Sequence, residues 1–100
     1  MTLKQVIEQM SMRPAMFLGD PTISRLEAFL LGWTHDPDNP AGEILSGFQK
    51  WIAERYKVRS SQSWATIIRF YASDDPSALK DAFALFKEYF ELLEMEQRTE

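Results

Sequence analysis

The segment DDPSALKDAFALFKEYFELLEMEQ, residues 74–97, decides the fold of this chain of 100 residues. Two aspartates followed by proline are typical of a helix start, because a carboxylate caps free backbone N–H groups and proline fits the first turn. Apolar side chains then recur every three or four residues, which predicts a helix with one buried face. The residues of that face are Leu79, Ala82, Phe83, Phe86, Tyr89, Phe90 and Leu93. We therefore expect a last helix of about 20 residues, or ~30 Å.

Four shorter segments show the same helical spacing of apolar residues. We expect a first helix capped by Thr2 and ending near Met10, a second from Thr22 or Ser24 to Trp33, a third over 41–58 and a fourth over 64–71, capped by Ser63. The residues between them hold proline, glycine or polar runs, so 11–21, 34–40 and 60–63 are expected to be irregular. The residues of 64–71 would also suit a strand, but a lone strand has no partner. The sequence thus predicts one all-α domain over residues 1–100, a bundle of about five helices.

The composition is that of a globular protein, with 45% apolar and 26% charged residues. The absence of cysteine excludes a disulfide framework and thiolate chemistry. The first residues contain charges and no continuous apolar stretch, so we expect no secretory signal. Because no window approaches the ~18 apolar residues of a membrane span, we expect a cytoplasmic protein that does not enter the membrane.

The sequence offers little for catalysis. His35 is the only histidine and lies in a loop rich in proline and aspartate, where His35, Asp36 and Asp38 would hold a cation weakly at best. No serine has the surroundings of a nucleophile elbow, and the four glycines form neither a phosphate-binding loop nor a dinucleotide fingerprint. We therefore expect a protein without enzymatic activity, cofactor or metal.

A basic cluster in the middle of the chain raises the question of nucleic-acid binding. Its cations are Lys50, Arg55, Lys57, Arg59 and Arg69, interleaved with Trp51, Tyr56 and Trp64. These aromatic residues fit buried helical stripes, and the net charge is −4 with a pI near 5.0. We therefore favour the interpretation that these aromatic residues pack in the core, and we expect no nucleic-acid partner.

The negative charge is concentrated at the end of the chain. Residues 71–100 hold eight acidic and three basic residues, a charge of −5, whereas residues 1–70 carry +1. Such a distribution favours a basic protein partner, although carboxylates that merely solvate a helix would give the same pattern. The candidate partner-binding residues are Trp33, His35, Asp36, Asp38 and Glu43 around the second loop, and Asp74, Asp75, Asp81, Glu88, Glu91 and Glu94 along the last helix.

Two motifs carry a family resemblance. Residues 13–19, RPAMFLG, and 26–33, LEAFLLGW, resemble the RPxM(F/Y)LG and LEAFLxG(Y/W) motifs of a group of small bacterial proteins. Further matches are Phe48, Trp51, Arg55, Tyr56, Ser63, Trp64 and Ile68, so the likeness spans most of the chain. In the first motif we expect Met16, Phe17 and Leu18 to fill the core and Arg13 to brace the turn at Gly19.

The resemblance implies a function, because these proteins look like immunity proteins of bacterial toxin systems, including contact-dependent growth inhibition. Such a protein would neutralise an imported toxin domain, and an acidic surface would fit the cationic cleft of a nuclease. Trp33 and His35 would then serve as partly buried anchors beside the acidic loop. The alternative is a helical adaptor or homodimer, in which Leu85, Leu92 and Met95 would form an open apolar patch. We expect the free protein to be a monomer or a weak dimer.

Overall fold

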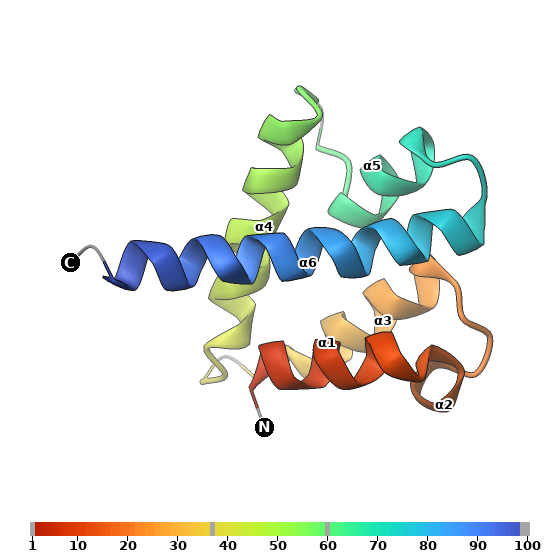
Figure 1. Cartoon of the computed structure of the whole chain (residues 1–100), viewed down its shortest axis with the longest axis horizontal. Coiled ribbons are helices and arrows are strands. Elements are labelled where there is room, and N and C mark those ends of the chain that lie inside the picture. The colour runs from red at the N-terminus through yellow and green to blue at the C-terminus, as the bar shows by residue number, and fades with distance from the viewer. Residues whose placement is uncertain (1, 37, 60, 99–100) are drawn as a thin grey trace.

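The computed structural model describes residues 2–36, 38–59 and 61–98, with the side chain of Arg98 left aside. These residues form six helices, and no strand occurs among them (Figure 1). The helices are α1 (Leu3–Met12), α2 (Pro14–Leu18), α3 (Ile23–Trp33), α4 (Ala41–Arg55), α5 (Trp64–Tyr71) and α6 (Asp75–Arg98). The predicted all-α fold is confirmed, and residues 64–71 are helical.

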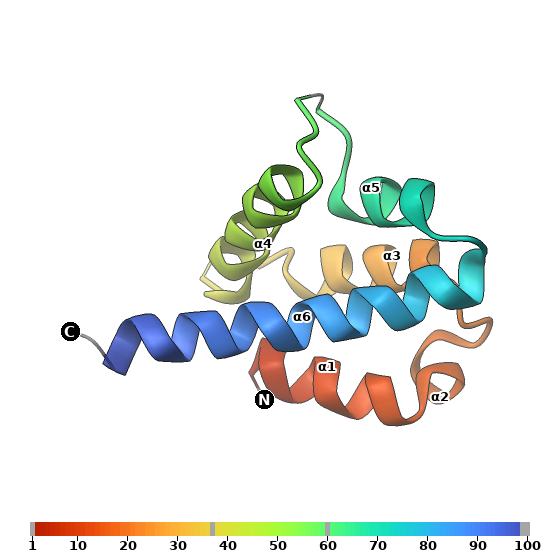
Figure 2. The ribbon, with the colours of Figure 1, turned by 45° about the horizontal axis from the view of Figure 1, so that its top comes forward.

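Helix α6 is the longest helix, and the other helices lie on its two sides (Figure 2). Its 24 residues correspond to roughly 36 Å at the usual rise per residue, close to the longest extent of 39 Å. Helices α1 and α2 lie along one side of α6, and α3, α4 and α5 lie along the other (Figure 2). Because α6 meets other helices on both sides, it buries a broad apolar face, as its sequence predicts.

The centre of the core is aromatic. The rings of Phe48 in α4 and Phe86 in α6 stack with centroids 3.9 Å apart, and both side chains are fully buried. Trp64 of α5 stands edge-on to both rings, at 5.5 and 5.3 Å. Each such pair adds about 0.5–1.5 kcal/mol beyond the burial of its surface. Helices α4, α5 and α6 therefore meet at this aromatic cluster. Among the described residues, no polar or charged side chain is buried.

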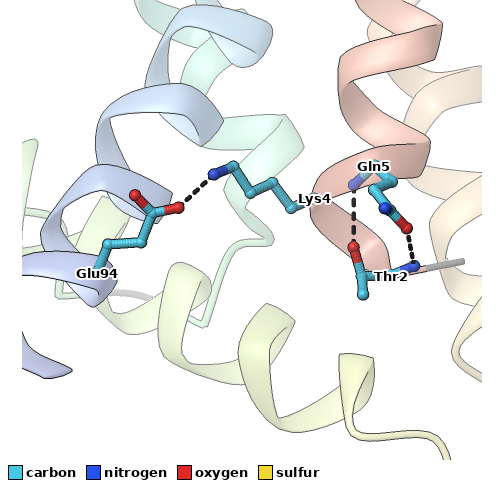
Figure 3. A network of polar contacts seen from close by, with 4 residues as sticks. All are labelled: Thr2, Lys4, Gln5 and Glu94. Carbon is cyan, nitrogen blue, oxygen red and sulfur yellow. Dashed lines mark hydrogen bonds and ion pairs between the residues drawn. The ribbon is translucent and has the colours of Figure 1, made fainter.

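Side-chain caps set where the helices begin. Thr2 and Gln5 form a capping box, in which Thr2 Oγ1 accepts from the Gln5 backbone N–H at 3.2 Å and Gln5 Oε1 accepts from Thr2 at 2.9 Å (Figure 3). Thr22 and Ser63 accept from backbone N–H groups three residues later in the same way. The predicted caps are therefore confirmed, with Thr22 rather than Ser24 at the start of α3.

The region 11–21, expected to be irregular, is mostly helical. Helix α1 continues to Met12, and α2 begins at Pro14. Proline is tolerated at the first helical position, because its missing N–H would have no partner there. The chain turns only at Gly19, which has a φ of 72°. The expectation failed because Pro14 was taken as the end of helical structure, whereas it starts a second helix.

The predicted roles of the RPAMFLG segment are only partly correct. Leu18 is buried and Phe17 packs edge-on against Phe29 at 6.4 Å, but Met16 is 74% exposed and does not fill the core. Arg13 is exposed, and it is Arg25 that braces the turn, donating from Nη1 to the Leu18 carbonyl at 3.2 Å. A five-residue helix has one inner side, so only some of its apolar residues reach the core.

Helix α4 ends at Arg55, three residues earlier than expected. Beyond it, the Val58 N–H donates to the Ala53 carbonyl at 2.9 Å and the Lys57 N–H donates to the Glu54 carbonyl at 3.2 Å. These two bonds form the Schellman arrangement, which requires a left-handed residue between helix and loop. That residue is Lys57, with a φ of 55°.

Candidate partner-binding surface

The predicted acidic residues do not form one surface. Asp74 and Asp75 lie where α6 begins, whereas Glu91 and Glu94 lie near its other end. Sixteen to twenty helical residues separate the two pairs, which corresponds to roughly 24–30 Å. The two pairs therefore lie at opposite ends of α6.

Asp74 and Asp75 have structural partners. Asp74 caps α6, since its Oδ1 accepts from the Ser77 backbone N–H at 2.8 Å, and hydrogen bonds from Ser77 lower the pKa of this carboxyl. Asp75 Oδ1 accepts from the Ile23 backbone N–H at 3.2 Å and so ties the start of α6 to the start of α3. Both carboxylates compensate the positive ends of helix dipoles, which accounts for their presence without a partner.

Asp81 and Glu88 face the end of α4. Glu88 forms an ion pair with Arg55 at 2.9 Å, and the guanidinium of Arg55 lies 5.3 Å from the ring centre of Trp51. Burial and then the charge of Asp81 raise the pKa of Tyr56. These two acidic residues therefore lie beside the basic residues of the middle segment.

The loop after α3 is organised by its own side chains. Asp36 Oδ1 accepts from the Asp38 N–H at 3.0 Å, and Asn39 donates to the Trp33 carbonyl at 3.1 Å while accepting from the Ala41 N–H at 3.0 Å. Trp33 is half-buried against the core, whereas His35, Asp36, Asp38 and Glu43 are exposed. The loop thus presents two carboxylates and one imidazole to solvent, and Glu43 in the first turn of α4 adds a third carboxylate beside them. Pro37 lies outside the described residues.

A groove runs between α1 and α6. It has a volume of about 630 Å³, and its apolar side chains include Ile7, Phe83 and Phe90. A smaller hollow of about 260 Å³ shares Ser11 and Phe83 with it and extends the groove toward α2. Phe83 was predicted to be fully buried but is only half-buried, because α1 does not cover it completely.

Carboxylates border the far end of this groove. Lys4 of α1 forms an ion pair with Glu94 of α6 across it (Figure 3). The bond to Glu94 raises the pKa of Lys4, and the charges of Glu94, Glu8 and Glu91 add to that shift, which shows that all three acidic groups lie around the ammonium. The cations Lys4 and Lys87 also line the groove, so its charge is mixed with an acidic excess of one.

The acidic loop lies toward the same end of the molecule. In both views the chain between α3 and α4 and the start of α1 lie toward the C-terminal half of α6, and Figure 2 shows α6 running between them. We call this region the acidic end and define it by Glu8, Asp36, Asp38, Glu43, Glu91 and Glu94. The structure therefore separates the predicted set into the acidic end, the helix caps and a group beside α4.

Several surface features differ from the sequence expectations. Leu85, expected in an open patch, is only 6% exposed, whereas Leu92 and Met95 are 39% and 59% exposed. Phe70 and Tyr71 of α5 are 76% and 55% exposed, although no exposed role was predicted for them. The signal was available, since Trp64, Ile67 and Ile68 already supply the inner face of an eight-residue helix. Such a helix leaves its last aromatic residues outside.

The described residues hold no group of three or more His, Asp or Glu side chains that could bind a metal ion. Among the helices traced, none combines the length and the apolar character needed to cross a membrane. Comparisons of the chain with protein-family models, curated proteins and solved structures give no match.

Proposed function

We propose that this protein is a cytoplasmic immunity protein that binds and neutralises a bacterial toxin domain through its acidic end and the adjoining groove. One observation carries the proposal: carboxylates of α1 and α6 border an apolar groove of about 630 Å³, and further exposed carboxylates between α3 and the first turn of α4 lie toward the same end of α6 (Figures 1 and 2). Apolar surface supplies affinity in protein interfaces, and the surrounding charge selects the partner and speeds its approach. No catalytic group of the chain takes part.

The partner best suited to this surface is basic. A nuclease domain has a cationic substrate cleft, which repels other cations and attracts carboxylates placed like the phosphates of its substrate. Asp36 and Asp38 are exposed and linked by a hydrogen bond, and this bond reduces the conformational freedom that they lose on entering a cleft. Neutralisation follows from occlusion, because a cleft filled by carboxylates admits no phosphate backbone.

The proposal predicts that a toxin domain is encoded immediately upstream of this gene, and that domain is the reagent for the direct test. Cells that produce this domain together with the protein are expected to survive, and the two proteins are expected to co-purify. The variant Asp38→Lys with Glu91→Lys reverses two exposed charges of the acidic end and is expected to abolish protection. The control, Asp20→Lys with Glu54→Lys, makes the same charge change at two exposed sites outside the acidic end and is expected to protect like the wild type.

Both variants alter only exposed side chains, so circular dichroism and thermal unfolding are expected to match the wild type within a few degrees. Full protection by the acidic-end variant would refute the proposed surface. Equal loss in both variants would mean that net charge, and not this surface, governs binding.

A second candidate function is a homodimeric interaction module. Leu92 and Met95 are the exposed apolar residues of α6, and both lie on its C-terminal part. Two such helices side by side would cover them. Sedimentation at increasing concentration distinguishes the candidates: a stable dimer that dissociates on Leu92→Glu favours the module, and a monomer favours the immunity protein.

A further inference from the structure

A second surface lies away from the acidic end and has the opposite chemistry. Phe70 and Tyr71, at the end of α5, are largely exposed and meet edge to face with centroids 5.1 Å apart. Tyr71 is held from behind by Tyr56, whose ring stacks on it at 5.0 Å. Tyr71 is thus fixed in place, while the more exposed ring of Phe70 faces solvent without further cover. The two neighbouring rings together form an exposed apolar patch, which is the kind of surface on which a partner packs.

Cations surround these rings. A cleft of about 300 Å³ is lined by Lys57, Val58, Arg59, Gln62, Phe70 and Tyr71, with no carboxylate among the lining residues. Phe70 also borders a second hollow of about 300 Å³, whose lining includes Arg69 and Glu27. The chain from residue 55 to residue 73 contains four basic and no acidic residues. Arg55 is paired with Glu88, and Arg69 lies near Asp74 and Glu27. The excess positive charge of this region, which we call the cationic aromatic surface, is therefore that of Lys57 and Arg59 at the cleft.

Lys57 holds its cation at an energetic cost. It occupies the left-handed position that ends α4, with a φ of 55°, where glycine would fit without strain. The Schellman ending of α4 accounts for this backbone conformation. The residue that occupies the position carries a cation, and its side chain lines the cleft next to Phe70.

We propose that the cationic aromatic surface binds single-stranded nucleic acid. Exposed aromatic rings next to cations are the elements with which proteins bind unpaired strands, because bases stack on the rings while phosphates meet Lys and Arg. Here a base packs on Phe70, and the flanking phosphates reach Lys57 and Arg59 in the cleft. A duplex keeps its bases stacked on each other, so it offers no face to Phe70.

The expectation of no nucleic-acid partner rested on net charge, which averages over two unlike surfaces. At physiological salt a charge is screened beyond about 8 Å, so the local cations govern what approaches Phe70. The loop before α5 and α5 itself lie on the side of the molecule away from the start of α1 (Figures 1 and 2). This inference does not depend on the proposed toxin partner.

The test is fluorescence anisotropy with labelled probes. A 12-nucleotide single-stranded RNA of mixed sequence and the DNA strand of the same sequence are each titrated with the full chain, and a 12-bp duplex and a poly-glutamate peptide serve as alternative probes. We expect saturable binding of at least one single strand, with the RNA and DNA arms showing which sugar is preferred. The logarithm of affinity is expected to fall with the logarithm of salt concentration with a slope near −1.4, for about two phosphates neutralised.

Three variants locate the site. Phe70→Ala is expected to weaken strand binding about fivefold or more through the loss of base stacking. Lys57→Gly with Arg59→Gln is expected to weaken binding and to flatten the salt dependence, while the glycine relieves strain and keeps the fold stable. The control, Leu31→Ala, removes an apolar side chain that is 63% exposed on α3 and is expected to leave affinity unchanged.

Failure of both single strands to bind at protein concentrations up to about 1 mM would overturn the proposal, as that is the weak end of specific recognition. It would also be overturned if Phe70→Ala bound like the wild type, or if the duplex or poly-glutamate bound as tightly as the strands. Toxin protection is measured separately, so loss of one function leaves the other test intact.

Discussion

The close approach of the Tyr89 side chain of α6 to Gly47 of α4 provides a sharp prediction. A Cβ atom added at Gly47 would lie 2.3 Å from the Oη atom of Tyr89 and 3.6 Å from its Cζ atom. The first distance is a clash and the second is ordinary contact. Replacement of glycine by alanine within a helix normally stabilises a protein by about 1 kcal/mol. Overpacking at a well-filled contact costs about 1–3 kcal/mol.

The gain from replacing glycine by alanine in the helix and the cost of overpacking oppose each other only while the hydroxyl of Tyr89 is present. Gly47→Ala is therefore expected to lower the free energy of unfolding by about 1 kcal/mol in the wild type. In the Tyr89→Phe background the same change is expected to raise it by roughly 0.5–1 kcal/mol. The coupling between the two sites then amounts to about 1.5–2 kcal/mol, within the range of residues in direct contact.

Urea denaturation of the four proteins of this cycle measures the coupling. Tyr89→Phe alone removes one hydroxyl from a half-buried ring and serves as the control, with an expected change within about 0.5 kcal/mol. If Gly47→Ala stabilised both backgrounds equally, the helices would not approach as closely as described, and the reasoning would be refuted.

Three further predictions concern the helix ends. Asp75→Ala is expected to lower the free energy of unfolding by about 1–2 kcal/mol, because the Ile23 N–H loses its acceptor. The control, Asp81→Ala, is expected to change that free energy by less than about 0.5 kcal/mol, and urea denaturation measures both variants. The hydrogen bonds from Ser77 lower the pKa of Asp74 from 3.8, so the contribution of this carboxylate to stability is complete above that pH and is lost as pH falls through the lower folded pKa. Acid unfolding of Asp74→Ala is therefore expected to lack this pH-dependent component. Identical acid profiles for the variant and the wild type would contradict the prediction. Lys57→Gly is expected to raise the free energy of unfolding by roughly 0.5–1 kcal/mol, because glycine adopts the left-handed conformation without strain. The variant is expected to have a thermal midpoint several degrees higher. An unchanged or lower midpoint would show that no strain exists there.

Much of the fold follows from local rules. The apolar spacing of residues 79–93 and the caps Thr2, Thr22 and Ser63 define helices through interactions within a few residues. The extra helix α2 was missed because Pro14 stops one helix and starts another, and the sequence alone does not distinguish these roles. The early end of α4 was missed because Lys57 adopts a conformation that its residue type does not favour.

The candidate surfaces were less predictable, since they depend on which helices pack side by side. Asp75 looks like a surface carboxylate in the sequence, yet it caps a helix whose start lies 52 residues earlier. Leu85, expected in an open patch, instead meets the core for the same reason. Counting charge along the sequence also placed Asp74 and Asp75 in one group with Glu91 and Glu94, although the two pairs lie at opposite ends of α6.

The most direct test of the acidic end as the partner surface is the association rate constant with the toxin domain that the proposal predicts to be encoded upstream. We expect Asp38→Lys with Glu91→Lys to slow association at least about tenfold at low salt, since steering by complementary charge contributes ~10-fold to 10³-fold. Asp20→Lys with Glu54→Lys, which adds the same charge elsewhere, is expected to slow it by no more than about threefold. Equal association rates for the two variants would contradict the assignment of the acidic end.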